Sequence, residues 1–243
     1  MSKNALRLGA LALSAATVVG VGSASAFGAT PAASPPSLST VQANAADAIT
    51  LRVNDLNAAI SKAMSVKQLG SRGSTLISYL QADIAPLQAL NTKIAGDTSV
   101  SSAQADAATI FTNYRVLALV LPAAHLAGTA DGVDVTVIPN LMSLSAKAAS
   151  YVNPSNQAVL QPLINDMNAQ IGTATTATAG VAATVLGYTP SQWNSNHDLL
   201  APSRGSVQAS EKNITTARSD ADQIRSILKT AKASPTTTPT TAA

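Results

Sequence analysis

The sequence lacks several residues on which common kinds of site depend. It contains no cysteine and one glutamate, Glu211, and aromatic residues make up 3% of its 243 positions. Without cysteine, disulfides and thiol nucleophiles are excluded. Di-iron and di-manganese centres in helical bundles need several glutamates and a Glu-x-x-His spacing, so that class of centre is excluded too. Stability must therefore come from packing, with a core built largely from Ala, Leu, Val and Ile.

The histidines and carboxylates form no catalytic or metal-binding pattern. His125 and His197 have no carboxylate or second histidine at helical metal-ligand spacing, and we interpret both as structural or surface residues. No G-x-S-x-G sequence follows a predicted strand, and the aspartates are mostly isolated. We predict a protein that is not an enzyme, with no catalytic residues, no metal ligands and no cofactor.

The N-terminal residues have the pattern of an export signal. Two basic residues precede an apolar run over 8–22, and a small-residue A-S-A pattern ends at Ala26. This order is typical of a secretory signal peptide, here 1–26, with cleavage between Ala26 and Phe27. We therefore expect a secreted or cell-envelope-associated protein.

The charge of the expected mature chain gives no reason to predict nucleic-acid binding. The leader holds two of the fifteen basic residues, which leaves 13 basic against 12 acidic residues. Basic residues do cluster late in the chain, but two aspartates lie among them: Arg218, Asp220, Asp222, Arg225, Lys229 and Lys232. We interpret this cluster as a solvated helix face and expect no nucleic-acid partner.

Apolar residues recur at alternating spacings of three and four through most of the chain, which indicates amphipathic helices. The expected helices cover 39–64, 74–94, 101–127, 136–151, 154–185 and 203–232. Short loops between long helices favour antiparallel neighbours. We therefore predict an all-α fold, an up-and-down antiparallel bundle of about six long, Pro-kinked helices over 39–233. A Pro/Ser/Ala-rich linker, 27–38, and a Pro/Thr-rich tail, 234–243, are expected to be disordered.

Capping residues and turn residues divide these helices. Capping boxes are expected at Ser39 with Gln42, at Ser101 with Gln104 and at Thr189 with Gln192. The third box, with Pro190 after the cap, accounts for Tyr188 and Trp193 as packed flanking residues without a ligand. Helix breaks are expected at Gly96-Asp97 and at Asp131-Gly132. The VDVTVI segment after the second break, 133–138, has β character but no strand to pair with.

An eight-residue pattern occurs twice. VNDLNAAI at 53–60 is followed 111 positions later by INDMNAQI at 164–171. At 100° per residue the apolar positions of each copy point one way and the Asn-Asp pair points the other, with Arg52 placed to pair weakly with Asp55. We interpret the repeat as a shared packing solution rather than a duplicated binding motif, and duplication of a helical hairpin is the alternative.

One apolar run carries the candidate ligand site. VLALVLPAAHLA, 116–127, is 12 residues long, too short to span a bilayer, so we expect no transmembrane span in the mature chain. Prolines at 86, 122, 139 and 162 are expected to kink their helices and splay them apart. The candidate ligand-binding residues flank or belong to the run: Tyr114, Arg115, Leu117, Leu121 and His125.

Two segments carry a resemblance to known proteins. DIAPLQALNTKIAGDT, 83–98, and IFTNYRVLALVLPAAH, 110–125, resemble uncharacterised secreted alanine-rich helical proteins of high-GC Gram-positive bacteria. The resemblance implies export and helical structure, and it implies no activity and no site residues. Our expectation is an exported, non-catalytic bundle with an interaction or structural role toward an unknown protein or cell-envelope partner. The alternative is an extracytoplasmic carrier of a lipid or other apolar small molecule held between kinked helices.

Overall fold

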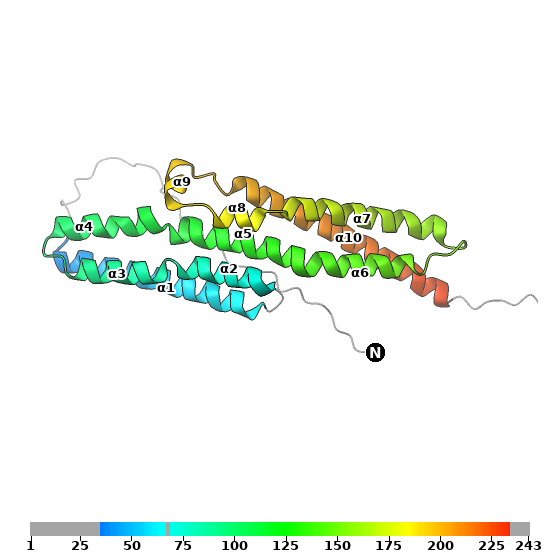
Figure 1. Cartoon of the computed structure of the whole chain (residues 1–243), viewed down its shortest axis with the longest axis horizontal. Helices are drawn as coiled ribbons and strands as arrows, with labels where there is room; N and C mark the ends of the chain where they lie inside the picture. The colour runs from blue at the N-terminus through cyan, green and yellow to red at the C-terminus, as the bar shows by residue number, and fades with distance from the viewer. Residues whose placement is uncertain (1–34, 67–68, 234–243) are drawn as a thin grey trace, which may run out of the picture.

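The computed structural model describes residues 35–66 and 69–233. Every element of regular structure in these two ranges is a helix, which confirms the predicted all-α class. The expected leader, most of the expected linker and the expected tail lie outside the described residues. The chain runs up and down along one long axis, and each long helical segment returns beside the one before it (Figure 1).

A central helix of 50 residues, Val100–Ala149, runs the length of the molecule (Figure 1). Its segments are α4 (Val100–Thr109), η2 (Ile110–Tyr114), η3 (Val116–Val120), α5 (Leu121–Gly132), η4 (Val133–Val137) and α6 (Ile138–Ala149), where η marks π-helical turns. The expected break at Asp131-Gly132 is therefore wrong, and 101–127 and 136–151 belong to one helix. Asp131 does not end the helix because its carboxylate accepts a hydrogen bond from Arg72 of α2 (2.8 Å).

Two prolines lie inside the central helix without ending it. A proline ring collides with the carbonyl four residues before it in an α-helix. The turns before Pro122 and Pro139 are widened: the N–H of Leu121 bonds to the carbonyl of Val116, and the N–H of Ile138 to that of Val133. These five-residue spacings are π-turns, which give the ring room. At both prolines the helix therefore continues through a widened turn.

Three helices pack along the first half of the central helix: α1 (Leu38–Ser65), α2 (Gly70–Gln81) and α3 (Ile84–Ala95). The helix expected over 74–94 is divided at Ala82-Asp83 because Pro86 would displace the carbonyl of Ala82. At the end of α3, Gln42 of α1 donates to the carbonyls of Ile94, Ala95 and Asp97, so one side chain caps a neighbouring helix.

The second half is formed mainly by α7 (Gln157–Thr178) and α10 (Ala201–Ala233), with the short α8 (Val181–Leu186) and α9 (Pro190–Ser195) between them. The helix expected from Pro154 to Val185 is shorter because Gly180, at φ 74°, turns the chain between α7 and α8. Pro154 lies in the preceding turn. Pro162 is inside α7.

The helix caps agree with the predictions in one case of three. Thr189 and Gln192 form the expected capping box of α9, with Pro190 as its first residue. The N-caps of the other two helices lie two residues earlier than expected. Ser37, not Ser39, caps α1, and Ser99, not Ser101, caps α4. In both cases a serine two residues before the expected one accepts the backbone N–H bond.

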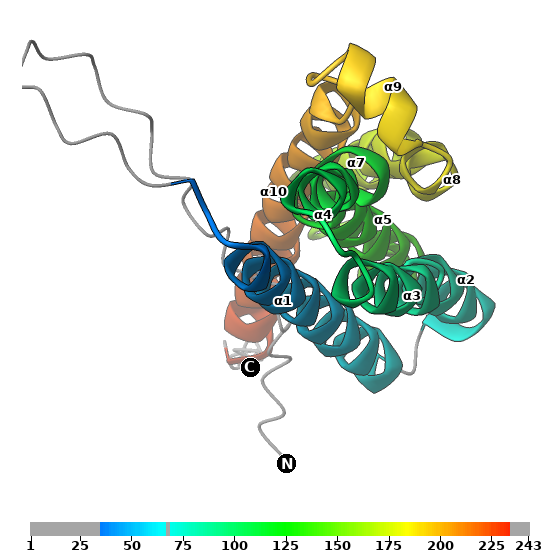
Figure 2. The same cartoon turned by 90° about the vertical axis from the view of Figure 1, so that its left-hand side faces the viewer.

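The buried apolar residues form two separate clusters along the central helix. The first core lies between α1, α2, α3, the segments from α4 to α5, α8 and the start of α10. The second core lies between η4, α6, α7 and the rest of α10. The end-on view shows α1, α2 and α3 on one side and α7 and α8 on the other (Figure 2). The helices thus pack around two cores, which share the central helix and α10.

A group of polar side chains links the two cores, and we call it the polar clasp. Arg72 of α2 forms ion pairs with Asp131 of α5 (2.8 Å) and Asp134 of η4 (3.1 Å). The buried hydroxyl of Thr178, at the end of α7, donates to the other oxygen of Asp134 (2.5 Å). The hydrogen bonds therefore run from α2 through the central helix to α7.

Candidate functional site

The five candidate ligand-binding residues do not form one site. Leu121 and His125 face the same cavity in the first core. Tyr114 and Arg115 are half-buried one to two turns earlier, and Leu117 is 46% exposed. None of these three lines the cavity. The order of the residues in the sequence placed them together, but Arg115 adopts a left-handed backbone conformation (φ 49°) that interrupts the helical register between them.

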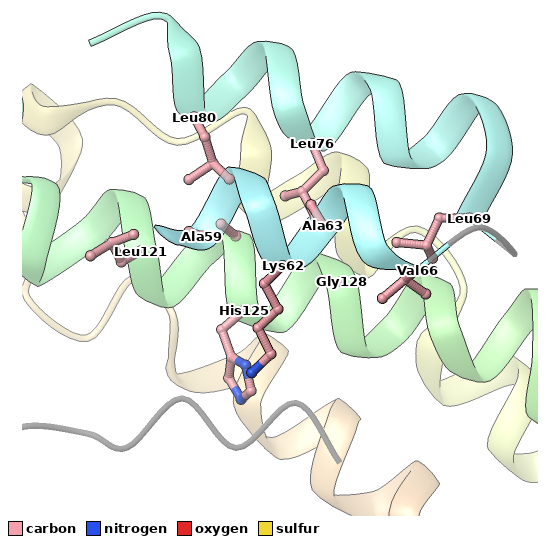
Figure 3. Close-up of a pocket in the computed structure, with 11 residues that line it drawn as sticks. Ala59, Lys62, Ala63, Val66, Leu69, Leu76, Leu80, Leu121, His125 and Gly128 are labelled. Carbon is pink, nitrogen blue, oxygen red and sulfur yellow. The ribbon is translucent and has the colours of Figure 1, made fainter. Parts of the chain in front are cut away.

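The cavity beside His125 is small. It lies between α1, α2 and α5, and Figure 3 shows Leu76, Leu80, Leu121 and Ala63 around it, with the Lys62 amine next to the His125 ring. Its volume is about 30 Å³, which is enough for roughly one or two water molecules. It is too small for a lipid or another molecule of that size.

The imidazole of His125 is neutral over a wider pH range than a free histidine. Burial lowers its pKa, the nearby Lys62 ammonium lowers it further, and Glu211 of α10 acts in the opposite direction. Its Nδ1 atom is buried and has no hydrogen-bond partner among the described residues. His197, in contrast, is an exposed ring packed edge-on against Trp193 at 5.7 Å.

Arg115 has a structural partner. Its Nε donates to the amide oxygen of Asn194 in α9 (2.6 Å), and the Asn194 amide nitrogen donates to the carbonyl of Thr112 (3.0 Å). These bonds hold α9 against the interrupted part of the central helix.

Tyr79, Asp83 and Tyr114 lie around the interruption between α2 and α3. Burial raises the pKa of Tyr79 to about 12, with a smaller contribution from the Asp83 carboxylate. Burial also raises the pKa of Tyr114, again with Asp83 contributing, and burial raises the pKa of Asp83 itself. No hydrogen bond joins the three side chains in the described structure, so they offer no arranged acid and base.

The repeated sequence pattern is a packing frame, as predicted. Leu56 of α1 and Met167 of α7 occupy equivalent positions, and each is fully buried, one in each core. The polar contacts differ between the copies. Asn168 accepts a hydrogen bond from Ser145 of α6 (2.6 Å), whereas its counterpart Asn57 is exposed.

Arg52, beside the first copy of the pattern, is not on the solvated face. It is only 7% exposed, it donates to the carbonyl of Ala48 (2.8 Å), and its guanidinium lies 4.6 Å from the centre of the Phe111 ring. The expected ion pair with Asp55 is not formed, because Arg52 turns toward η2 of the central helix. The two copies therefore share no common arrangement of polar groups that a ligand would recognise.

The second core has a larger opening, which we call the α6/α10 groove. Its volume is about 250 Å³, close to the lower end of ligand pockets, at about 300 Å³. One wall is formed by Leu144, Lys147, Ala148 and Tyr151 of α6. The other is formed by Ala221, Ile224, Arg225 and Leu228 of α10, and Met167 of α7 lies between the walls.

The groove is open because its facing residues are small and few contacts join α6 to α10. Ala148 and Ala221 contribute little side-chain volume to opposite walls. On the rim, Leu144 remains 42% exposed and Tyr151 52% exposed. Large apolar side chains at the edge of an open groove are a feature of binding surfaces rather than of a closed core.

Both charged residues that line the groove are cationic. Lys147 has no ion pair or hydrogen bond from its amine within residues 35–66 and 69–233. Arg225 forms an exposed i,i+3 pair with Asp222 (2.5 Å), and Asp222 does not line the groove. An apolar groove with one unpaired and one surface-paired cation has a net positive rim.

Among the described residues, no group of three or more His, Asp or Glu side chains is arranged to hold a metal ion. The central helix is long and apolar enough to cross a membrane by length and composition, but 67% of its most apolar window is buried in the protein, as in core helices that pass the same test.

The geometry defines a class of molecule: an all-α protein with two cores on one central helix and an apolar, cation-lined groove in the second core. Comparisons with family models, curated proteins and solved structures found no match to the chain.

Proposed function

We propose that this chain is an exported, non-catalytic helical protein that acts at the cell envelope or outside the cell by binding a partner in the α6/α10 groove. The observation that carries the proposal is the groove: about 250 Å³ of open space with a mostly apolar lining, and with Leu144 and Tyr151 exposed at its rim. A face of this kind is costly to leave exposed to water without a use.

Two further observations support a binding role. The acids, bases and hydroxyls that catalysis requires do not converge on the groove, whose lining is apolar apart from Lys147, Arg225 and the Tyr151 phenol. The export part of the proposal rests on the leader pattern at 1–26. N-terminal sequencing of the accumulated protein tests it: Phe27 as the first residue supports export, and an intact Met1 contradicts it.

Native mass spectrometry of the chain isolated from its own organism tests the binding role. We compare the wild type with Ala221→Leu, which fills the groove, and with Ala209→Leu, an exposed control on α10 outside the groove. A non-covalently held species present on the wild type and the control but lost from Ala221→Leu supports the proposal. The same species on all three chains places the site elsewhere, and a wild-type chain without any species contradicts the proposal.

A further inference from the structure

The shape of the groove limits what it can hold. Nine residues line it, whereas a stable protein interface needs roughly 20–30 residues on each side. Leu144 to Tyr151 and Ala221 to Leu228 each cover seven helical steps, which is about 10 Å at a rise of roughly 1.5 Å per residue. Because α6 and α10 run in the same direction (Figure 1), these walls form a slot that suits one thin, linear apolar molecule.

The charges on the groove select the polar end of such a molecule. Lys147 belongs to one wall and Arg225 to the other, so each wall carries a cation that attracts an acidic group. A neutral head group satisfies neither cation, and a cationic one is repelled by both. The Tyr151 phenol, 52% exposed on the same wall as Lys147, adds a hydrogen-bond donor at the rim.

From these features we infer that the α6/α10 groove binds a single-chain anionic amphiphile, such as a fatty acid, with its alkyl chain on the accessible side chains of Leu144, Ala221 and Leu228 and its acidic group beside Lys147 and Arg225. The slot accommodates about eight methylene groups, given its length of roughly 10 Å and an advance of about 1.25 Å per carbon along an extended alkyl chain. This inference rests on the proposed function and names the ligand class of the same groove.

Asp222 offers a test in which a substitution should tighten ligand binding rather than weaken it. Its carboxylate holds Arg225 at the rim and brings a negative charge near the expected position of the ligand's acidic group. Asp222→Asn releases Arg225 and removes that repulsion. Binding of an anion should then become tighter, by about two-fold for an exposed pair. A site that only collects apolar molecules is not sensitive to this change.

The experiment is isothermal titration calorimetry of the full chain with monomeric dodecanoate, dodecanol and dodecyltrimethylammonium. We expect saturable binding of dodecanoate that is weakened about five-fold in Lys147→Ala, tightened in Asp222→Asn and weakened at least about ten-fold in Ala221→Leu. Matched controls on α10 outside the groove, Lys212→Ala and Ala209→Leu, should bind as the wild type does. Circular dichroism confirms that each variant is folded before titration.

The outcomes separate this inference from the proposed function. Equal binding of dodecanoate and dodecanol, lost in Ala221→Leu and unchanged in Lys147→Ala, overturns the anionic ligand but keeps the groove as the binding site. Dodecanoate binding that is unaffected by Ala221→Leu overturns both assignments of the groove. Binding to vesicles of anionic phospholipid without binding of monomeric dodecanoate overturns the inference in favour of a membrane surface.

Discussion

In the first core the central helix is covered by α1, α2, α3, α8 and the start of α10, whereas in the second core, among the described residues, η4 and α6 pack against α7 and the rest of α10. The cavity beside His125 in the first core measures about 30 Å³, and the groove between α6 and α10 measures about 250 Å³. Both cores use the same small and branched apolar residues. The comparison shows that the number of covering helices, and the size of the residues that face each other, decides whether an apolar stripe is closed.

The largest expected difference between the two cores concerns fully buried side chains at equivalent positions of the repeated pattern. Leu56→Ala leaves an enclosed void in the first core, and we expect it to lower the free energy of unfolding by about 3–5 kcal/mol. Met167→Ala removes a side chain that borders the open groove, where the surroundings can relax, so we expect about 2–3 kcal/mol. Urea denaturation measures both, and an equal or larger loss in Met167→Ala contradicts the comparison.

The polar clasp should couple the two cores. Arg72→Ala leaves the Asp131 carboxylate, 9% exposed, without its cation, and we expect a loss of about 1–3 kcal/mol. Trp193 packs against the first core, so its fluorescence reports that half, and circular dichroism reports the whole chain.

These two signals should show coincident urea transitions in the wild type and separated transitions in Arg72→Ala. Arg204→Ala, an exposed arginine on α10 outside the clasp, is the matched control and should leave both midpoints unchanged. If Arg72→Ala behaves like Arg204→Ala, the clasp does not couple the two cores.

The smallest expected effect concerns a buried acid in the second core. Asp131 in the clasp has Arg72, which offsets part of the rise in pKa that burial causes. Asp220 is 5% exposed, one of its oxygens has no hydrogen-bond partner among the described residues, and burial together with Asp166 raises its pKa. Its carboxyl therefore holds a proton to higher pH in the folded chain than in the unfolded chain.

That difference fixes the sign of the pH dependence. The contribution of Asp220 to stability is fully present below its unfolded pKa and is lost as the pH rises through its raised folded value. Asp220→Asn should remove this decline and raise the stability at neutral pH by about 1 kcal/mol. Thermal denaturation at several pH values measures it, and an Asn variant that is less stable than the wild type at pH 7 contradicts this account.

Helical periodicity was enough to predict the all-α class and the frame of the repeated pattern, because burial of one face follows directly from spacing. It failed at Asp131-Gly132, where a tertiary ion pair with Arg72 keeps a turn-forming sequence helical. It also placed Arg52 in solvent, since nothing local reveals the Phe111 ring against which it packs. Local patterns do not contain partners that lie far away in the sequence.

The candidate site shows the same limit. The spacing of Leu141, Leu144 and Ala148 indicated an apolar face on 136–151, but not that Leu144 would be left 42% exposed. Two signals pointed to the groove without locating it: Lys147 within the apolar stripe, and small residues at both Ala148 and Ala221. Which helices face each other, and how closely, is a property of the assembled fold.

Hydrogen–deuterium exchange of the full chain, with and without saturating dodecanoate, tests most directly whether the open second core is the binding half. We predict that dodecanoate slows amide exchange in 144–151 of α6 and 221–228 of α10, with the first core unchanged. Slowed exchange around Leu121 and His125, or an identical pattern with and without dodecanoate, would contradict the assignment of the groove as the ligand site.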